Sequence, residues 1–430
     1  MPGSLQVPVN KDGAYESAPD PGHDVSDVNL QLFCDENPQD TSNPENKGFV
    51  LSYTQKGGSL EKGRTIMDCF DPARVPALAT LAQEFAVCDH WFCSVPGPTW
   101  SNRFFVNAAT SDGVAAMGSK YYVRKYPMRT LYENLAKAGA SWRIYFHDIP
   151  QSLALWNLRK PAMLRHFRRF TDNFSADVRK GDLPHYTFIE PRYFPFLWKK
   201  ANDQHPPHDV RLGEDLIADV YDTLRGSAFW PGTLLIVLYD EHGGYFDHVA
   251  PPAVRNPDGK ISTDPPFDFR RGGPRVPAVL VSPWIAKGTV DSTVYDHASI
   301  PATLKGLFQL GDFLTMRDRT SNPLDLSLWS GEMRDDTPET LPRHAEIQAE
   351  AEAAKVALTV ESVSASLDEA SEEPLSEFQQ SLLDLASTFS PEPELQAVAV
   401  ARPIETEHEG AVEVRTQTQL FFARQGVPLE

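Results

Sequence analysis

The sequence predicts an α/β protein with a mostly parallel sheet that helices cover on both sides. Segments with helical apolar spacing alternate with short segments of strand length between residues 75 and 308. Two of the short segments, residues 233–238 (TLLIVL) and 276–281 (VPAVLV), are nearly continuous apolar runs. Such runs are typical of parallel strands buried on both faces. The alternation of helices and buried strands favours helices on both sides of one sheet.

Local patterns predict the individual elements. Residues 25–33 carry a short helical pattern, and residues 75–85 (VPALATLAQEF) have the spacing of an amphipathic helix. Residues 86–92 follow as a strand, and residues 100–109 as a helix opened by Thr99, a favourable N-cap residue. Further helices are expected over residues 131–138, 213–224 and 299–308, and further strands over residues 142–146 and 186–189.

The chain carries a large excess of acidic residues. Against 40 Lys and Arg stand 59 Asp and Glu, which gives a formal net charge of -19 over 430 residues. Such a field repels nucleic acid at long range, so we expect no nucleic-acid partner. A phosphate-ester substrate would need a bound cation that reverses the potential locally.

Composition changes after about residue 330. Between Arg343 and Arg402 the only basic residue is Lys355, whereas acidic residues, Ala, Ser and Gln are frequent. We therefore expect an α/β domain over residues 1–335 and an acidic tail over residues 336–430, partly helical and partly disordered.

Four cysteines do not form a disulfide framework in a chain of this length. They are expected to be small core residues, with a Cys88–Cys93 or Cys34–Cys69 bridge left open. No apolar run reaches the roughly 18 residues of a transmembrane helix. The first residues lack the basic and apolar regions of a signal peptide. The compartment and the oligomeric state stay open, with a secreted or periplasmic location if the N-terminus is incomplete.

The strongest local signal is YDEHGG at residues 239–244. Asp240 and Glu241 follow directly on the apolar run 233–238, and the two glycines let the backbone turn sharply. Open α/β sheets place their sites at the carboxyl ends of strands. Two adjacent carboxylates beside His242 suit a divalent cation, whereas a solvated acidic turn explains the Asp-Glu pair taken alone.

A second signal is SVPGPTWSNR at residues 94–103. Thr99 stands at the start of a helix, where amide N–H groups and the helix dipole favour a phosphoryl group. A hydroxyl nucleophile needs activation, and coordination to a metal supplies it. The alternative is that Thr99 only caps its helix. Asn102 and Arg103, one turn on, contact phosphate or hold the loop.

Four loop histidines have turn residues and an aspartate nearby. A carboxylate can fix the tautomer of an imidazole and raise its basicity, and an imidazole can protonate a leaving group. His185 and His248 are expected to be structural. The four candidates are His23 in PDPGHD, His205 and His208 in HPPHD, and His297 in DHAS.

These motifs together resemble the phosphoesterase family that includes non-specific phospholipases C and a bacterial acid phosphatase. The matches run in the order of that family over about residues 19–320. The matching segments are PDPGHD (19–24), FAVCDHWFCSVPGPTWSNR (85–103), YTFIEPRYF (186–194), HPPHDVRLGEDLIADVYDTLR (205–225), TLLIVLYDEHGGYFDHVAPP (233–252), GPRVPAVLVSPWI (273–285) and DHASIPATLKGLF (296–308).

The resemblance implies an alkaline-phosphatase-like three-layer α/β/α sandwich and hydrolysis of phosphate esters by a Ser or Thr hydroxyl bound at a metal. It implies Thr99 as the nucleophile, with Asp240 and Glu241 as ligands of one divalent ion of unknown identity. A phospholipid is the favoured substrate, and a smaller phosphate ester is the other. The residues implied on the phosphate or leaving-group side are His23, His208 and His297, with Asn102, Arg103, His205 and Asp209 as further substrate-binding candidates.

Five aromatic residues surround the proposed nucleophile loop. They can meet an acyl chain of a lipid substrate, and the packing of a buried helix explains them equally well. They are Trp91, Phe92, Trp100, Phe104 and Phe105.

One departure from the family pattern concerns the N-terminus. Members of the family open with a strand and a motif similar to Glu-Asn-Arg-Ser-Phe-Asp, whose first two residues bind the metal, and nothing of that kind precedes PDPGHD here. We therefore expect an N-terminally truncated chain that lacks the first strand of its sheet. The alternative to an active phospholipase C or acid phosphatase is an impaired or inactive homologue that acts, if at all, as an interaction protein. A sulfatase or phosphomutase activity is less favoured by the motifs.

Overall fold

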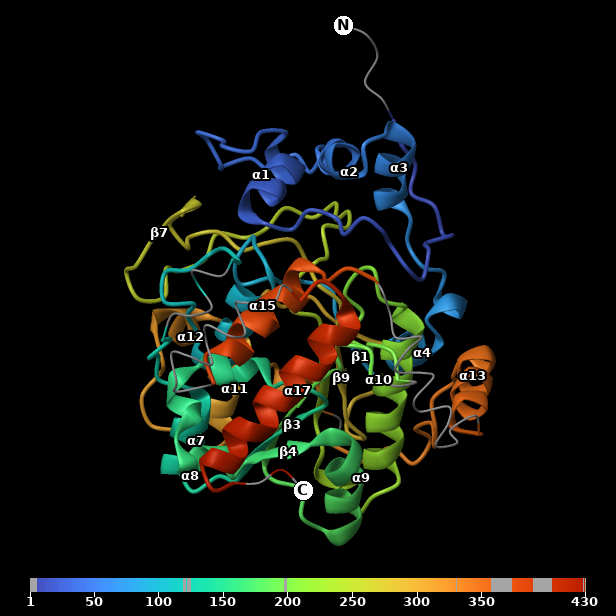
Figure 1. Ribbon diagram of the computed structural model, residues 1–430, viewed down its shortest axis with the longest axis vertical. Coiled ribbons are helices and arrows are strands. Elements are labelled where there is room, and N and C mark those ends of the chain that lie inside the picture. Colours follow the sequence, from blue (N-terminus) through green and yellow to red (C-terminus); the bar gives the residue numbers. More distant parts are fainter. Residues whose placement is uncertain are drawn as a thin grey trace, which may run out of the picture. The chain divides into compact units, whose positions relative to one another are not determined.

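The computed structural model describes residues 6–118, 121, 125–196, 199–329, 331–356, 373–389, 404–427 and 429 (Figure 1). Contacts divide the chain into two compact units, and both are discontinuous in sequence. Unit 1 comprises Met1–Ala116, His205–His208 and Pro231–Leu341, and unit 2 comprises Met117–Gln204, Asp209–Trp230 and Pro342–Glu430.

Unit 1 contains a four-stranded sheet in the order β10-β1-β9-β6. Its strands are β1 (Ala86–Cys88), β6 (Leu235–Leu238), β9 (Ala278–Val281) and β10 (Thr289–Asp291). β1 runs parallel to β10, whereas β9 runs antiparallel to both β1 and β6. All four residues of β9 are buried, so the core of the sheet lies around this strand.

The expectation of a central parallel strand at residues 233–238 is wrong. The strand formed there, β6, stands at the end of the strand order and is antiparallel to β9, with Leu235 opposite Val281. Its four residues are half-buried. An apolar run specifies that a strand buries side chains, but it fixes neither the direction of the strand nor its place in the sheet.

The helices of unit 1 follow the predicted pattern closely. α1 (Val25–Phe33) begins with a capping box of Asp24 and Asp27 and buries Val28 and Leu32 on one face. It packs beside α2 (Phe49–Gly57), which packs on α3 (Leu60–Arg64), as the blue part of Figure 1 shows. α4 (Pro76–Glu84) contacts β1 and β9, and α5 (Thr99–Ala108) contacts α11 (Ser299–Leu307). The helices expected over residues 25–33, 75–85 and 299–308 are thereby confirmed.

The remaining elements of unit 1 are short. The expected strand 86–92 is divided into β1 and β2 by a turn. β2 is parallel to β11, and β7 is antiparallel to β8. These elements are η1 (Thr65–Met67), η2 (Pro72–Arg74), β2 (Trp91–Phe92), β7 (Ser262–Thr263), β8 (Pro266–Phe267), β11 (Tyr295–Asp296), α12 (Met316–Thr320) and η6 (Leu326–Leu328), while η5 (Trp230–Gly232) spans the junction of the units.

Unit 2 is built on a three-stranded parallel sheet in the order β4-β3-β5. β3 (Trp142–Phe146) matches its predicted bounds, and β5 (Tyr186–Glu190) exceeds its prediction by one residue. Four of the seven described strand pairings in the chain are parallel, which agrees with the α/β class. The other elements are α7 (Leu131–Lys137), η3 (Gln151–Ala154), η4 (Trp156–Arg159), α8 (Pro161–Leu164), β4 (Phe167–Arg169), α9 (Phe170–Lys180), α10 (Val210–Arg225), α13 (Ala345–Val356), α15 (Glu377–Ser387) and α17 (Glu407–Arg424).

The C-terminal segment differs from the acidic tail expected over residues 336–430. α15 and α17 pack on each other, in the red part of Figure 1, and belong to compact unit 2. Phe422 of α17 is fully buried and stacks on Phe146 of β3, with 6.0 Å between ring centroids. Acidic composition concealed these buried apolar positions. The helices α13, α15 and α17 agree with a partly helical segment, and residues 357–372 and 390–403 of it lie outside the described residues.

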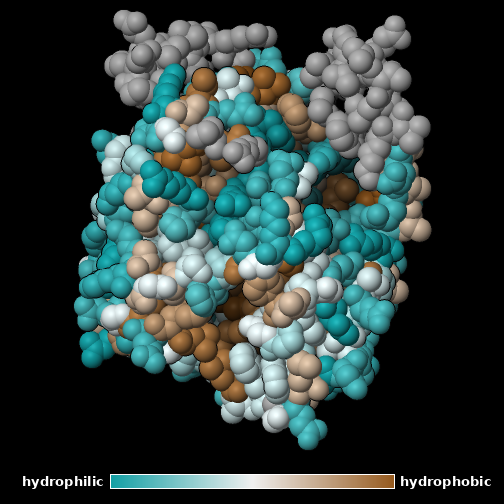
Figure 2. Space-filling view, turned by 90° about the horizontal axis from the view of Figure 1, so that it is seen from below, coloured by the Kyte–Doolittle hydropathy of each residue, from teal (hydrophilic) through white to brown (hydrophobic). Residues whose placement is uncertain are grey.

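Two further expectations concern the cysteines and the membrane. All four cysteines are free, with Cys88 and Cys93 buried and Cys34 and Cys69 exposed, so neither bridge left open by the sequence forms. Among the described helices, none has the length and apolar character needed to cross a membrane. Hydrophilic residues cover most of the face shown in Figure 2, with smaller groups of hydrophobic residues between them.

Candidate metal and phosphate site

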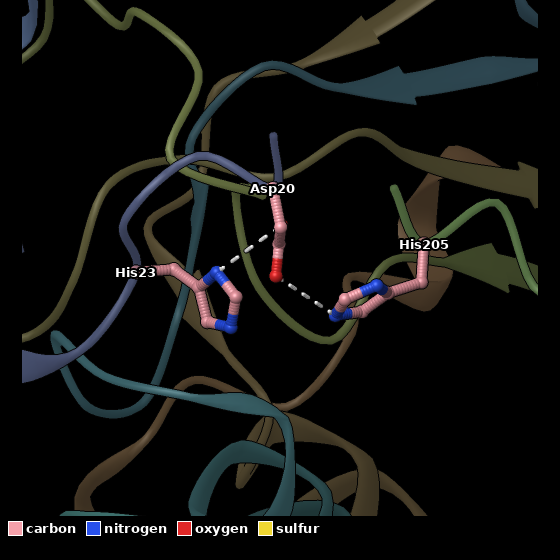
Figure 3. Close-up of side chains that lie close together, drawn as sticks. All are labelled: Asp20, His23 and His205. Atoms are coloured by element: carbon pink, nitrogen blue, oxygen red, sulfur yellow. Dashed lines mark ion pairs between the residues drawn. The ribbon is translucent and has the colours of Figure 1, made fainter. Parts of the chain in front are cut away.

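Three polar side chains of unit 1 converge from two loops. Asp20 and His23 lie in the loop before α1, and His205 lies in the segment 205–208 (Figure 3). His23 Nδ1 is 3.8 Å from Asp20 Oδ1, and His205 Nε2 is 3.9 Å from Asp20 Oδ2. One ligand atom from each residue lies within 4.8 Å of the other two. The three residues therefore surround one small space.

This cluster fits a divalent cation. Two atoms that bind the same ion at about 2.0–2.2 Å each lie farther apart than two hydrogen-bonded atoms do. The separations of 3.8 Å and 3.9 Å in this cluster meet that condition. Asp20 Oδ1 is buried and has no hydrogen-bond partner. His23 Nδ1–H donates to Pro21 O at 2.9 Å, which leaves Nε2 of the neutral ring as a potential ligand atom, the arrangement usual for metal-binding histidines. Burial raises the pKa of Asp20, although His205 and His23 act in the other direction.

Glu241 adds a second carboxylate to the cluster. Its side chain is 5% exposed, accepts from Gly243 N–H at 2.7 Å and lies 3.4 Å from His242 Nδ1. Burial alone would raise its pKa, but the charges of His23, His242 and His205 outweigh burial and lower it. Burial alone would lower the pKa of His23, but the charges of Glu241 and Asp20 outweigh burial and raise this pKa. The charge of Glu241 therefore acts on these histidines, and its printed contact is with the adjacent ring of His242.

The loop at 239–244 and the loop at 19–24 are in direct contact. Gly244 has φ +73°, and a Cβ there would lie 2.7 Å from both Gly22 O and Pro21 Cβ. Only glycine permits this approach. Gln31 of α1 joins both loops, because its amide donates to Gly22 O at 2.6 Å and its Oε1 accepts from His242 Nε2 at 2.9 Å. The loop that carries Glu241 is thus held against the loop that carries His23 by backbone packing and by Gln31 of α1.

Thr99 is the first residue of α5, and its N-cap is Pro98. The expected N-cap position is therefore wrong by one residue. The Thr99 side chain is 2% exposed. A purely capping role, the alternative considered for this threonine, is not what the structure shows. As the first residue of α5, Thr99 lies at the helix end that carries the first-turn N–H groups and the positive end of the helix dipole.

Asn102 and Arg103, one turn after Thr99 on α5, make different contacts. Asn102 is fully buried and holds the preceding loop, donating to Gly97 O at 2.8 Å and accepting from Val95 N–H at 3.1 Å. Arg103 Nε–H donates to Asp240 Oδ2 at 2.7 Å. Asp240 Oδ1 accepts from Glu241 N–H at 3.0 Å. The adjacent acids therefore diverge, since Asp240 contacts α5 whereas Glu241 contacts His242.

His297 is held in one tautomer. Trp91 Nε1–H donates to His297 Nδ1 at 3.2 Å, so the ring proton is on Nε2, which donates to Asp240 O at 2.6 Å. Burial lowers the pKa of His297. A neutral ring with both nitrogens bonded positions the backbone of Asp240 and is poorly suited to exchanging protons.

The HPPHD segment contributes one histidine to the cluster. His205 joins Asp20 and His23, although the sequence ranked it below His208. The His208 N–H donates to His205 O at 2.8 Å, which closes the turn. Asp209 belongs to unit 2, where it caps α10 by accepting from Arg211 N–H and pairs with the Arg211 guanidinium at 2.7 Å. Its place on the phosphate side stays a prediction.

The five aromatic residues near Thr99 form part of the core. Trp91, Phe92, Trp100, Phe104 and Phe105 are each 0–2% exposed. They offer no surface to an acyl chain, so the packing explanation considered for them is confirmed.

Sequence reasoning missed residues that work through partners distant in the chain. Asp20 stands three residues before His23, and this spacing in a loop was its only signal. Gln31 and Trp91 lie within ordinary helix and strand patterns, and nothing local marks them as partners of His242 and His297.

Comparisons with known proteins identify the family of this chain. A family model described as "Phosphoesterase family" matches residues 2–311. Non-specific phospholipase C3 of Arabidopsis thaliana is 41% identical over 359 residues, covering 79% of this chain and 67% of that protein. Non-specific phospholipase C4 of the same plant is 40% identical over 354 residues, covering 79% and 65%. Phospholipase C B of Mycobacterium tuberculosis (strain ATCC 25618 / H37Rv) is 29% identical over 269 residues, covering 54% and 50%.

The chain belongs to the Phosphoesterase family, and it is by class a phosphoric ester hydrolase. It spans about two thirds of the length of the plant relatives. Among solved structures it is similar to a protein in the alkaline phosphatase superfamily from Vibrio parahaemolyticus, with a TM-score of 0.35 and 14% identity over 61% of this chain and 67% of that one. A phosphonate monoester hydrolase from Silicibacter pomeroyi gives a TM-score of 0.34 and 12% identity over 61% and 73%.

Proposed function

We propose that this chain hydrolyses phospholipids in the manner of a phospholipase C, in a metal-dependent reaction with Thr99 as nucleophile. The bond between Arg103 Nε and Asp240 Oδ2 at 2.7 Å carries the proposal. Residues i and i+4 share one helix face, with about 5–6 Å between their Cβ atoms. Thr99 and Arg103 have this spacing, so the hydroxyl lies one turn from a side chain that contacts the acidic loop. The plant relatives support the substrate class by name.

The residues that would hold a divalent ion are Asp20, His23 and His205, with Glu241 beside them. The oxygen and imidazole donors of this set suit zinc or manganese better than an all-oxygen site would. Asp240 remains a predicted ligand. Such an ion, when bound, stabilises negative charge on phosphoryl oxygens and on a coordinated hydroxyl. It also offsets the acidic charge of the chain where an anionic substrate must bind.

The proposed reaction has two displacement steps, and the chain's own residues take part in each. Thr99 Oγ1 loses its proton to water and forms a bond to phosphorus while the bond from phosphorus to the glycerol oxygen breaks, and the departing oxygen takes up a proton. Water then displaces Thr99 Oγ1 from the phosphorylated head group, which splits one displacement into two. The first-turn N–H groups of α5 and Arg103 favour the phosphoryl oxygens.

The proton for the leaving oxygen is assigned to His208. His297 is bonded through both ring nitrogens, and a histidine that binds an ion, as His23 and His205 would, cannot deliver a proton with the same nitrogen. Among the histidines that the sequence singled out for acid catalysis, this leaves His208.

The test is release of phosphocholine from phosphatidylcholine micelles by the purified chain. Thr99→Ala should lower kcat on the order of 10³-fold or more, because it removes the atom that forms the covalent intermediate. Thr99→Ser should retain measurable turnover and trap radioactive phosphate from a phosphate-labelled lipid after acid quench. Thr320→Ala, at the end of α12, is the matched control and should behave as the parent.

Chelation should abolish turnover, and one divalent metal should restore it. Turnover that survives in Thr99→Ala, or an undiminished rate after complete chelation, would contradict the proposal. A folded chain that neither binds metal in calorimetry nor turns over lipid would favour the alternative of an inactive interaction protein.

A further inference from the structure

A cavity with both charged and apolar lining lies within unit 2, and none of its lining residues belongs to the candidate site. Its volume is about 600 Å³. His147 follows directly on β3 and Arg192 stands two residues after β5, so one wall lies at the carboxyl ends of two parallel strands. Helices α9, α10 and α13 supply the other walls. The carboxyl edge of a parallel sheet is the usual place for a ligand.

The strand-end wall carries positive charge. Arg192 is only 8% exposed, and one of its terminal amino groups donates to Lys200 O at 3.2 Å. Its Nε is buried without a hydrogen-bond partner. Lys199 and Lys200 line the same cavity. A buried guanidinium with an unused donor is costly unless a ligand completes it.

One buried acid, Asp148, acts electrostatically on this arginine. Asp148 is fully buried and accepts the N–H groups of Tyr193 and Phe194, each at 2.9 Å. Arg415 of α17 also acts on Asp148, and its Nε too is buried without a partner. Burial and the charge of Arg192 lower the pKa of the intervening His147 to about 3, so this ring is neutral. The strand-end wall therefore has an excess of cations.

Another part of the lining, on α10, carries an unused acceptor. Asp215 Oδ2 accepts from Gln348 at 2.7 Å, whereas Oδ1 is buried without a hydrogen-bond partner. Asp219, one turn on, is already paired with Arg343 at 2.7 Å. Asp215 is thus the acid of this wall with an oxygen left for a cationic group. Apolar side chains also line the cavity, among them Phe170, Leu212, Leu216 and Ile347.

We propose that this cavity binds a small zwitterion, the phosphate monoester of an amino alcohol, with its phosphate on Arg192 and its ammonium on Asp215. Three cationic side chains match a phosphate dianion better than a carboxylate, and guanidinium groups bind phosphate through several donors. The apolar lining fits the methylene groups between the two charges. The inference rests on unit 2 alone, and it stands whether or not the chain hydrolyses phospholipids.

The experiment is isothermal titration calorimetry of the full chain in excess chelator with phosphoethanolamine, inorganic phosphate and ethanolamine as separate probes. Chelation removes metal-bound phosphate in unit 1 as a source of signal. Phosphoethanolamine should bind with one site per chain, more tightly than either fragment. Arg192→Met should weaken phosphoethanolamine and inorganic phosphate alike by at least about tenfold, the usual effect of losing a hydrogen bond to a charged group.

Asp215→Asn separates the two ends of the ligand. It should weaken phosphoethanolamine by about tenfold and leave inorganic phosphate unchanged. Asp182→Asn, at an exposed ion pair with Arg143, is the matched control and should change neither. If Arg192→Met unfolds by circular dichroism, Lys199→Met carries the same test on the same wall. Absence of phosphoethanolamine binding, or equal affinity in parent and Asp215→Asn, would overturn the proposal.

Discussion

Arg103 and Asp240, 137 residues apart in sequence, are joined by a 2.7 Å bond from Arg103 Nε to Asp240 Oδ2. Their side chains are 14% and 27% exposed, so the pair is partly withdrawn from water. A charge-assisted bond in such a setting is stronger than one at the surface. The bond fixes the helix that begins at Thr99 against the loop that follows β6, and a hydroxyl nucleophile depends on this placement.

Arg103→Met should therefore lower the rate of phosphocholine release more than it lowers stability. We expect kcat to fall on the order of 10²-fold, because a misplacement of about 1 Å at a reacting group has that effect. The free energy of unfolding should fall by about 1–3 kcal/mol, since Asp240 loses its partner while partly buried. Lipid turnover and urea unfolding measure the two effects.

Arg168→Met is the matched control for Arg103. Arg168 bonds Asp177 at 3.0 Å in unit 2, so its loss also breaks an arginine–aspartate pair. The control should retain the parent kcat. Equal losses of kcat in both variants would mean that the Arg103 effect is one of general stability and not of placement.

Much of the fold could be predicted from local sequence patterns. α1 and β3 have their predicted bounds, because period and capping residues are properties of adjacent residues. The place of β6 at the end of its sheet could not be predicted, because pairing depends on β9, some 40 residues downstream. The acidic composition of the C-terminal segment predicted a tail, yet Phe422 packs on β3 because a few buried apolar residues outweigh many exposed charges.

The candidate site was predicted less completely than the fold. The motifs placed Glu241 and His23 in loops, and the structure brings them together. The choice of His205 over His208 depends on the path of a turn, and the participation of Asp20 depends on loop geometry. The bond from Trp91 to His297 fixes a tautomer through residues 206 positions apart, which no local pattern encodes.

His205→Asn should weaken the binding of the divalent metal by at least about 100-fold. Loss of a residue that only orients a ligand typically costs about 10–100-fold in metal affinity, and loss of a ligand should exceed this range. Competition with a coloured chelator measures the affinity directly, without any substrate. Circular dichroism should remain that of the parent.

Two further histidine variants serve as comparisons for His205→Asn. His185→Asn, where the native ring nitrogen lies 2.7 Å from Ser141 Oγ in unit 2, should retain the parent metal affinity. His208→Asn should retain metal affinity and lose turnover, because His208 is assigned to proton transfer. A larger loss of metal affinity in His208→Asn than in His205→Asn would show that His208, and not His205, binds the metal.

Gly244→Ala should disrupt the contact between the two loops of the site. The added Cβ would lie 2.7 Å from Gly22 O, in a backbone conformation with φ +73°. We expect a loss of stability of more than the about 1–2 kcal/mol that a left-handed conformation costs alone, and a clear loss of metal affinity. Thermal unfolding and metal titration measure these effects.

Gly259→Ala isolates the backbone contribution. Gly259 has φ +80°, and nothing lies within 4 Å of a Cβ added there. This variant should show the conformational cost and unchanged metal affinity. If the two alanine variants lose equal stability and both bind metal as the parent does, close packing of the loops is not what positions Glu241.

The ion pair of Asp247 and Arg275 should make unit 1 sensitive to acid. Arg275 bonds Asp247 through its guanidinium at 2.8 Å and through its backbone N–H at 3.0 Å. Burial alone would raise the pKa of Asp247, but these bonds outweigh burial and lower it. A carboxyl whose pKa is lower in the folded than in the unfolded state stabilises the fold above the unfolded value of about 3.9. That stability is lost as pH falls through the folded value.

Asp247→Asn should therefore cost about 1–3 kcal/mol at pH 7 and less as the pH drops below about 4, where the parent loses the same contribution. Urea unfolding between pH 2 and 7 measures the free energy of unfolding of both proteins. Asp268→Asn removes an exposed acid whose nearest cation, Arg270, is 3.9 Å away, and it should leave the profile unchanged. Parallel profiles for the parent and Asp247→Asn would show that the carboxyl of Asp247 titrates alike in both states, so that its bonds to Arg275 contribute nothing that pH can remove.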